Sequence, residues 1–145
     1  SGLPQILGVQ AAGSAPLVLG HPVDYPETVA TAIRIGRPAR GEQALQAAEE
    51  SNGRIIAISD EEILTMQRRL AANGVWVEPA SAAGVAGLAH QIRTGQIDPK
   101  GQRVVAVCTG HGMKDPDIIA QSMPTPHRLP ARLADLESFI LEITQ

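Results

Sequence analysis

The residues with the widest range of possible chemistry lie in one short stretch, Cys108–Pro116, with the sequence CTGHGMKDP. The stretch follows directly on an apolar run, Arg103–Val107, with the sequence RVVAV. Thr109 offers a hydroxyl that would point into a crevice, and Gly110 and Gly112 would let a ligand approach the backbone closely. In the alternative interpretation, Thr109 only turns the chain from a strand into a loop. The residue types therefore indicate hydrogen bonding to a ligand at the end of a strand.

Other side chains of this kind are weaker candidates for chemistry. His111 could act as an acid, a base or a hydrogen-bond donor, although a single histidine in a loop more often does none of these. Cys108 is the only cysteine, and because no base is paired with it we interpret it as a core residue of its strand rather than as a nucleophile. The four histidines show no spacing typical of metal ligands, so no metal is implied: His21, His90, His111 and His127.

Two further segments place polar residues after apolar runs. Glu78 ends an apolar run and precedes Pro79, and we expect its carboxylate to point at a ligand rather than into solvent at the rim of a sheet. Ser81 is interpreted as a helix N-cap rather than as a nucleophile, because the G-x-S-x-G sequence of many serine hydrolases is absent. Ser14, within Ala11–Pro16, could donate a hydrogen bond to a ligand or could simply belong to a turn.

The elements that must position these residues alternate between strand and helix. Four apolar runs predict strands, and none alternates with polar residues, which is typical of parallel strands covered on both faces. These runs are Ile6–Gln10, Ile55–Ile58, Val75–Val77 and Val104–Cys108. We therefore expect an α/β fold with a mostly parallel sheet of about four strands flanked by helices. Ligands bind at the carboxyl ends of the strands in such sheets, where the polar segments described above lie.

Helical periodicity between and after the runs predicts the covering helices. Ser59–Glu62 is a capping box at the start of one of them. The helices are expected over Pro26–Gly36, Glu42–Asn52, Ser59–Asn73, Ser81–Ala89 and from Pro130 to Ile143. The helix over Ser81–Ala89 is expected to have a buried face made mostly of small residues. Asp98–Gly101 predicts a turn, and Met123–Pro130, with three prolines, predicts an extended connector.

Length and composition limit the classes of function. The 145 residues suffice for one domain with a core. The 12 basic and 15 acidic residues give a net charge of −3 without a basic run, so we expect no nucleic-acid partner. The longest apolar runs are about six residues, far short of the roughly 20 that cross a bilayer, so we expect no membrane partner. A single cysteine and an N-terminus without a secretory signal favour a cytoplasmic location.

The sequence resembles threonine synthases, which are pyridoxal-phosphate enzymes of the tryptophan synthase β-like, fold type II family. Five segments occur in the same order in those enzymes and extend nearly from one end of this chain to the other. They are Val9–Gly20 (VQAAGSAPLVLG), Pro26–Gly36 (PETVATAIRIG), Ser59–Leu64 (SDEEIL), Val77–Gly87 (VEPASAAGVAG) and Thr109–Pro116 (TGHGMKDP). The ATAIRIG, EPASA and TGHGxKDP segments are specific to threonine synthases, since the related dehydratases usually differ at these places.

The resemblance implies pyridoxal 5′-phosphate as the cofactor, and the conversion of O-phospho-L-homoserine and water to L-threonine and phosphate, the last step of threonine biosynthesis. It implies that the Thr109 hydroxyl hydrogen-bonds the pyridine nitrogen of the cofactor. A hydroxyl does not hold a proton on that nitrogen, so it moderates the electron withdrawal by the ring while fixing its position. Glu78 matches an acid that lies near the cofactor in those enzymes. The resemblance assigns no catalytic residue to this chain.

Two parts of those enzymes have no counterpart in the sequence. The resemblance implies that the Schiff-base lysine and the glycine-rich phosphate loop belong to an N-terminal half, whereas Lys100 lies in a turn and Lys114 within the KDP segment. We therefore interpret residues 1–145 as the C-terminal part of the cofactor-binding large domain. We expect the isolated chain to be inactive, and its partners in the complete enzyme to be the missing N-terminal portion and a second copy in a homodimer. Two alternatives stay open: a serine/threonine dehydratase-like lyase, and a non-catalytic module that binds a ligand or a partner chain.

Overall fold

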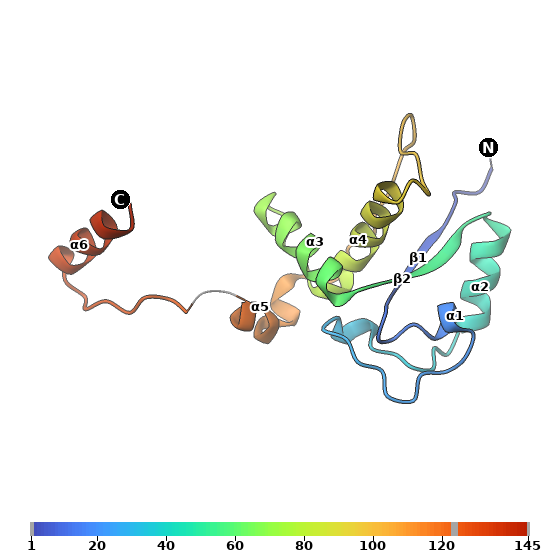
Figure 1. Cartoon of the computed structure of the whole chain (residues 1–145), viewed down its shortest axis with the longest axis horizontal. Helices are drawn as coiled ribbons and strands as arrows, with labels where there is room; N and C mark the ends of the chain where they lie inside the picture. Colours follow the sequence, from blue (N-terminus) through green and yellow to red (C-terminus); the bar gives the residue numbers. More distant parts are fainter. Residues whose placement is uncertain (1, 123–124, 145) are drawn as a thin grey trace.

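The computed structural model of the chain describes residues 2–122 and 125–144 (Figure 1). Two strands, β1 (Leu7–Ala11) and β2 (Arg54–Ile58), pair in parallel, with Leu7 opposite Arg54 and Ala11 opposite Ile58. The crossover between them contains α1 (Pro16–Leu19), a 3-10 turn η1 (Thr31–Ile33) and α2 (Gly41–Glu50). The α/β class and the parallel pairing are confirmed, but within the described residues the sheet has two strands rather than the expected four.

Two of the expected strands do not join a sheet. Val75–Val77 links two helices, and Val77 makes only an isolated antiparallel bridge with His111. Val104–Cys108 is irregular, with Val105 81% and Val107 76% exposed. Cys108, expected in the core, is also exposed. A strand needs a neighbour for its backbone N–H and C=O groups, and within residues 2–122 and 125–144 none pairs with this segment.

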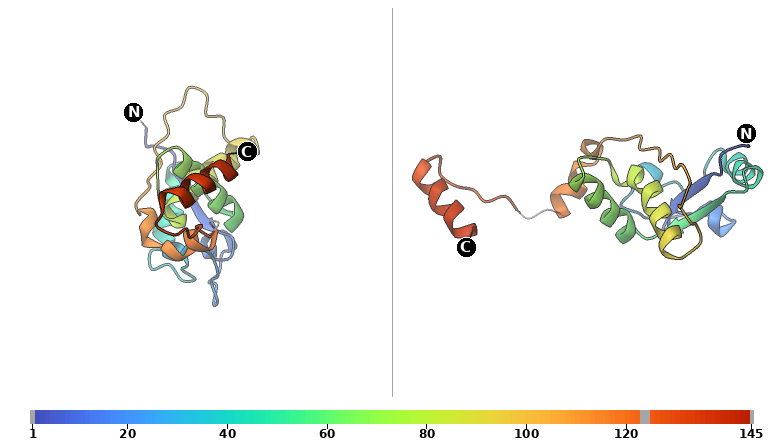
Figure 2. Two further views of the ribbon diagram at one scale, coloured as in Figure 1. Left: turned by 90° about the vertical axis from the view of Figure 1, so that its left-hand side faces the viewer. Right: turned by 90° about the horizontal axis from the view of Figure 1, so that it is seen from above.

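Two long helices, α3 (Asp60–Ala72) and α4 (Pro79–Arg93), lie side by side, and α4 also packs against both strands (Figures 1 and 2). The close approach depends on small residues: a Cβ at Gly87 would lie 2.4 Å from Val9. The predicted small-residue face of α4 is confirmed, since its alanines enter the core. The buried core cluster consists of Ala11, Ala30, Ile58, Ile63, Ala83 and Ala86.

The capping box at the start of α3 is confirmed. Ser59 Oγ accepts a hydrogen bond from the Glu62 amide at 3.2 Å, and the Glu62 carboxylate accepts one from the Ser59 amide at 3.2 Å. Each side chain therefore satisfies an amide that the helix leaves free.

The prediction of a helix over Pro26–Gly36 is wrong, because only the single 3-10 turn η1 forms there. Groups outside this segment bind its backbone: the Glu27 amide donates to Gly13 O at 3.0 Å, and the Val29 amide donates to Asp60 Oδ2 at 3.0 Å. Because these contacts satisfy the backbone in a loop, the local helical pattern does not determine the structure.

The start of α4 also differs from the prediction. The N-cap is Glu78 rather than Ser81, because Pro79 occupies the first helical position, where its missing N–H costs nothing. Ser81 therefore lies inside the first turn, and its hydroxyl is available to other partners.

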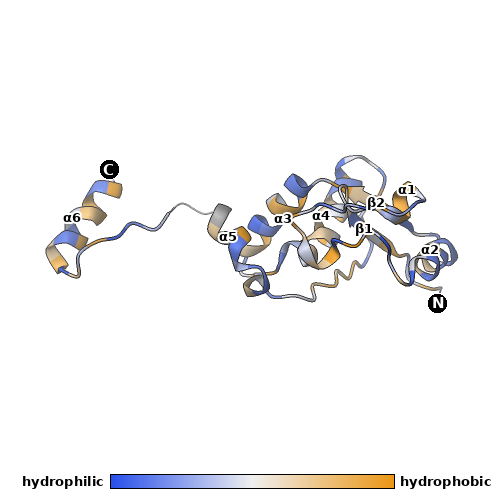
Figure 3. Cartoon of the chain, turned by 90° about the horizontal axis from the view of Figure 1, so that it is seen from below, coloured by the Kyte–Doolittle hydropathy of each residue, from blue (hydrophilic) through white to orange (hydrophobic). Residues whose placement is uncertain are grey.

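The C-terminal third forms η2 (Gly112–Lys114), α5 (Pro116–Ser122) and α6 (Leu133–Ile143). The helix expected after Pro130 is thus confirmed, and it stands apart from the other helices in Figure 1, in the right panel of Figure 2 and in Figure 3. Its apolar side chains are exposed: Leu133, Leu136, Ile140, Leu141 and Ile143. Of the expected connector, residues 125–130 are irregular, and residues 123 and 124 lie outside the described residues.

The turn over Asp98–Gly101 is confirmed, with the Lys100 amide donating to Asp98 Oδ1 at 3.0 Å. None of the helices in the described part of the chain combines the length and apolarity that crossing a bilayer requires.

Candidate functional site

The segment Thr109–Asp115, called here the 109–115 loop, lies against the N-terminus of α4. The Glu78 amide donates to Gly110 O at 3.0 Å, and the Gly112 amide donates to Trp76 O at 3.2 Å. This pairing brings together Thr109 and Glu78, the two residues predicted to lie at one site, although they are far apart in the sequence.

Ser81 connects the two predicted site residues. Its Oγ accepts a hydrogen bond of 2.8 Å from the Gly110 amide, and it lies 3.4 Å from both Thr109 Oγ1 and Glu78 Oε1. The Ser81 carbonyl accepts a contact of 3.6 Å from Cys108 Sγ. Ser81 is only 5% exposed, whereas Thr109 is exposed. Thr109 is therefore exposed to solvent, while its hydroxyl contacts the buried Ser81 hydroxyl on the protein side.

Glu78 is buried, with 3% of its surface exposed. Its Oε1 pairs with Lys114 Nζ at 3.1 Å, and a buried carboxylate needs such a partner to offset its loss of hydration. A Cβ at Gly110 would lie 1.8 Å from the same oxygen, so only glycine fits there. The Glu78 side chain thus points toward the 109–115 loop rather than into solvent at the rim.

His111 lies beside Trp76, with ring centroids 6.1 Å apart and 21° between the ring planes. His111 Nδ1 accepts a hydrogen bond of 3.2 Å from the Met113 amide. An accepting nitrogen carries no proton, so in the neutral ring the proton resides on Nε2. Gly112 allows this arrangement, since a Cβ there would meet Trp76 Nε1 at 1.6 Å.

The segment between α1 and α2 also contacts the 109–115 loop. Thr31 Oγ1 donates a hydrogen bond of 2.7 Å to Asp115 Oδ2, and Thr28 Oγ1 donates one of 2.5 Å to Asp60 Oδ1. The sequence predicts neither contact, because each joins residues of different segments and neither pair forms a recognised motif. The only local signal is the position of Asp60 in the capping box, at the carboxyl end of β2.

Ser14 is fully buried, and its hydroxyl donates to Ile33 O at 3.3 Å. Its single proton is used within the fold, so of the two interpretations the structure favours the turn. The isolated bridge between Ala11 and Ser14 supports the same assignment.

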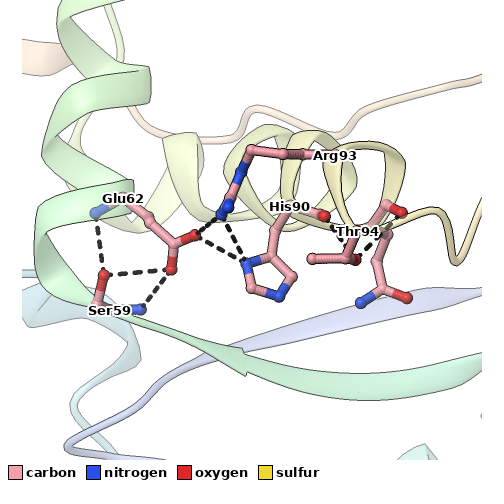
Figure 4. Close-up of polar contacts among 6 residues, drawn as sticks. Ser59, Glu62, His90, Arg93 and Thr94 are labelled. Carbon is pink, nitrogen blue, oxygen red and sulfur yellow. Dashed lines mark hydrogen bonds and ion pairs between the residues drawn. The ribbon is translucent and has the colours of Figure 1, made fainter.

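A separate polar cluster joins α3 to α4 (Figure 4). Glu62 Oε1 lies 2.8 Å from His90 Nδ1 and 2.7 Å from an Arg93 guanidinium nitrogen. The hydrogen bond with His90 is the main cause that holds the pKa of the Glu62 carboxyl below its ordinary value, and the bonds with Ser59 act in the same direction. Burial of Glu62 opposes them. This cluster stabilises the packing of the helix that carries Glu78 and Ser81 at its other end.

Comparisons with known proteins identify relatives of this chain. The chain is 53% identical over 129 residues to the threonine synthase of Mycobacterium tuberculosis, which covers 88% of this chain and 36% of the relative. It is 54% identical over 121 residues to the threonine synthase of a Synechocystis species, covering 83% of this chain and 31% of the relative. The chain thus spans about a third of the length of these curated relatives.

Among solved structures, a threonine deaminase from T.th. superposes with a TM-score of 0.48 and 25% identity, over 60% of this chain and 34% of that chain. The family model for "pyridoxal-phosphate dependent enzyme" matches residues 1–110, which is well over half of the chain. The chain therefore belongs to the family of pyridoxal-phosphate dependent enzymes.

Proposed function

We propose that the chain is part of a threonine synthase, which converts O-phospho-L-homoserine and water to L-threonine and phosphate. Relatives of that name at 53% and 54% identity support the proposal. The structural observation that carries it is the position of Thr109, which is exposed and whose hydroxyl lies 3.4 Å from Ser81 Oγ.

The residues present fit the pyridine end of pyridoxal 5′-phosphate. Thr109 would hydrogen-bond the ring nitrogen. Gly110 does not leave its backbone open to a ligand, because the Glu78 carboxylate occupies the space of the missing side chain. Glu78, the other residue proposed to lie near the cofactor, is 4% exposed at its side chain and paired with Lys114. Its carboxylate is therefore engaged within the protein, and the ring nitrogen would meet a neutral hydroxyl rather than an acid.

When bound, the cofactor supplies an electron sink for the bonds that break and form at the substrate carbons. The contribution of this chain is to orient and moderate that sink. A hydroxyl partner holds the ring in place without keeping a proton on its nitrogen, so the ring withdraws less charge than a protonated one. The Glu78–Lys114 pair fixes the loop that presents Thr109.

The lysine that anchors the cofactor would come from outside these residues. Lys114 Nζ is paired with Glu78 at 3.1 Å, and Lys100 lies in the turn over Asp98–Gly101. We therefore propose that residues 1–145 form the C-terminal part of the cofactor-binding large domain. A further portion of about twice this length in the relatives would carry the lysine and the phosphate loop, in a cytoplasmic homodimer.

The decisive experiment measures both phosphate and ammonia release by the complete protein that contains this chain. We expect phosphate from O-phospho-L-homoserine, with threonine as the organic product. Release of ammonia from threonine without phosphate chemistry would contradict the proposal and favour a dehydratase. Failure of the complete protein to bind pyridoxal 5′-phosphate would favour a non-catalytic module.

A further inference from the structure

We propose that Ser81 is a positioning residue that holds the Thr109 hydroxyl in place, so that Thr109 presents its proton to a hydrogen-bond acceptor on a bound ligand. The inference rests on the proposed function in one respect, since the acceptor would be the pyridine nitrogen of pyridoxal 5′-phosphate. The sequence predicts Ser81 only as a helix cap, whereas in the structure its hydroxyl has other partners.

The contacts of Ser81 bind both sides of Thr109 to one rigid turn. On one side, Ser81 Oγ accepts from the Gly110 amide at 2.8 Å; on the other, the Ser81 carbonyl accepts from Cys108 Sγ at 3.6 Å. The turn itself is firmly placed, because Pro79 begins α4 and the following residues Ala82 and Ala83 are 0% and 2% exposed.

The donors and acceptors around Ser81 Oγ determine which hydrogen bonds its hydroxyl can make. It carries one proton and two lone pairs, and the Gly110 amide occupies one lone pair. The proton has two acceptors at 3.4 Å, Glu78 Oε1 and Thr109 Oγ1. Glu78 Oε1 already accepts from Lys114 at 3.1 Å, so Thr109 can take the Ser81 proton without leaving the carboxylate unpaired.

A ligand that accepts a hydrogen bond from Thr109 completes the arrangement. The Thr109 proton then points outward, and the Thr109 oxygen accepts from Ser81. The result is a continuous series of hydrogen bonds from the Gly110 amide through the Ser81 and Thr109 hydroxyls to the ligand. Each donor in such a chain polarises the next, which strengthens the outermost hydrogen bond.

The test uses the complete protein loaded with pyridoxal 5′-phosphate carrying ¹⁵N in the ring. The readouts are the ¹⁵N chemical shift of the bound ring and the dissociation constant of the cofactor. Thr109→Val should move the shift toward that of a nitrogen without a hydrogen bond. Ser81→Ala should move it in the same direction by a smaller amount and weaken cofactor binding about 3- to 10-fold.

The double variant Ser81→Ala with Thr109→Val distinguishes a positioning role of Ser81 from a general loss of structure. If Ser81 acts through Thr109, Ser81→Ala should cause no further change of the shift in the Thr109→Val background, whereas independent effects would add. Ser81→Thr keeps the hydroxyl and should restore the wild-type shift, which keeps the inference testable if the alanine variant folds poorly.

Ser51→Ala is the matched control. Ser51 is 8% exposed, and its hydroxyl accepts from the Ile6 amide at 3.2 Å and donates to Ala48 O at 3.0 Å. It precedes β2, at the opposite end of the strands from Thr109, so it should leave the ¹⁵N shift unchanged. A shift that moves in Thr109→Val but not in Ser81→Ala would overturn the role of Ser81 alone. A shift that moves in neither would overturn the proposed contact of Thr109 as well.

Discussion

Thr31 donates a hydrogen bond of 2.7 Å to Asp115, although 84 residues separate them in the sequence. Asp115 follows Lys114, whose amine pairs with the buried Glu78 at 3.1 Å. Two adjacent residues therefore bind the 109–115 loop to two different elements, η1 on one side and the start of α4 on the other. This double attachment explains how a loop rich in glycine can present Thr109 in a fixed position.

Replacing Thr31 by valine tests the attachment to η1. The variant keeps the shape of the side chain and removes the hydrogen bond to Asp115. Because Thr31 is exposed, we expect the free energy of unfolding to fall by no more than about 1 kcal/mol. The dissociation constant of pyridoxal 5′-phosphate for the complete protein should nevertheless rise, since the loop loses one anchor.

The exposed pair of Asp24 and Arg37, at 2.7 Å, provides the control for this prediction. Arg37→Ala breaks a similar polar contact outside the site, so it should leave cofactor affinity unchanged. Equal loss of affinity in both variants would show that the Thr31 contact has no specific role.

Gly110→Ala tests the fit between the loop and Glu78. A Cβ at this position would lie 1.8 Å from Glu78 Oε1, so either the carboxylate or the loop must move. We expect a loss of about 1–3 kcal/mol in the free energy of unfolding, typical of overpacking at a buried position, together with weaker cofactor binding. Denaturant unfolding and cofactor titration measure the two effects.

Gly84→Ala, in the middle of α4, is the matched control. A Cβ at Gly84 meets nothing within 4 Å, and a helical alanine is favoured over glycine by about 0.5–1 kcal/mol. The control should therefore increase stability and leave cofactor binding unchanged. If Gly110→Ala behaved in the same way, the close contact with Glu78 would be wrong.

The capping box and the small-residue face of α4 could be predicted from the sequence, because both depend on residues within one or two helical turns. Ser59 and Glu62 are three positions apart, and the alanines of α4 recur at helical spacing. The parallel pairing of β1 and β2 followed from apolar runs separated by a crossover. Local patterns of this kind carry their own structural information.

The wrong predictions concern structure that depends on contacts between distant segments, which no local sequence pattern contains. Val104–Cys108 is as apolar as β2, but within the described residues no strand pairs with it, and the apolar run alone does not make a sheet. The contact of Asp60 with Thr28 and Val29 prevents a helix in a segment with helical spacing. Ser81, which lies 3.4 Å from both Thr109 and Glu78, is predicted from the sequence only as a helix cap, because no local pattern indicates its contact with the 109–115 loop.

The Glu62 cluster makes the stability of the α3–α4 pair depend on pH. The pKa of Glu62 lies below its ordinary value of 4.5 in the folded protein. The ionised carboxylate therefore stabilises the fold fully above pH 4.5, and this contribution is lost as the pH falls through the lower, folded-state pKa. Glu62→Gln should lower the free energy of unfolding by about 1 kcal/mol at pH 7. This difference from wild type should become smaller in acid.

Unfolding free energies measured from about pH 7 down to about pH 3 check this prediction. Glu61→Gln, one residue earlier and exposed, makes the same change of charge away from His90 and should show a smaller difference at neutral pH. A difference for Glu62→Gln that stays constant over the whole range would mean that its ionisation is not coupled to folding.

Thr109→Val tests the proposed contact with the cofactor in the complete enzyme. The variant keeps the branched shape and removes the hydroxyl, so the pyridine nitrogen loses its partner at a cost of about 1–3 kcal/mol. If that loss is felt in transition states in which negative charge spreads into the ring, turnover should fall roughly 10- to 100-fold. Thr109→Ser keeps the hydroxyl and should be far milder. If Thr109 only turned the chain, valine and serine would lower activity by similar small amounts, because neither side chain would touch the cofactor. Turnover of the two variants, compared at equal folded fraction, separates these cases, and wild-type activity in Thr109→Val would exclude the contact.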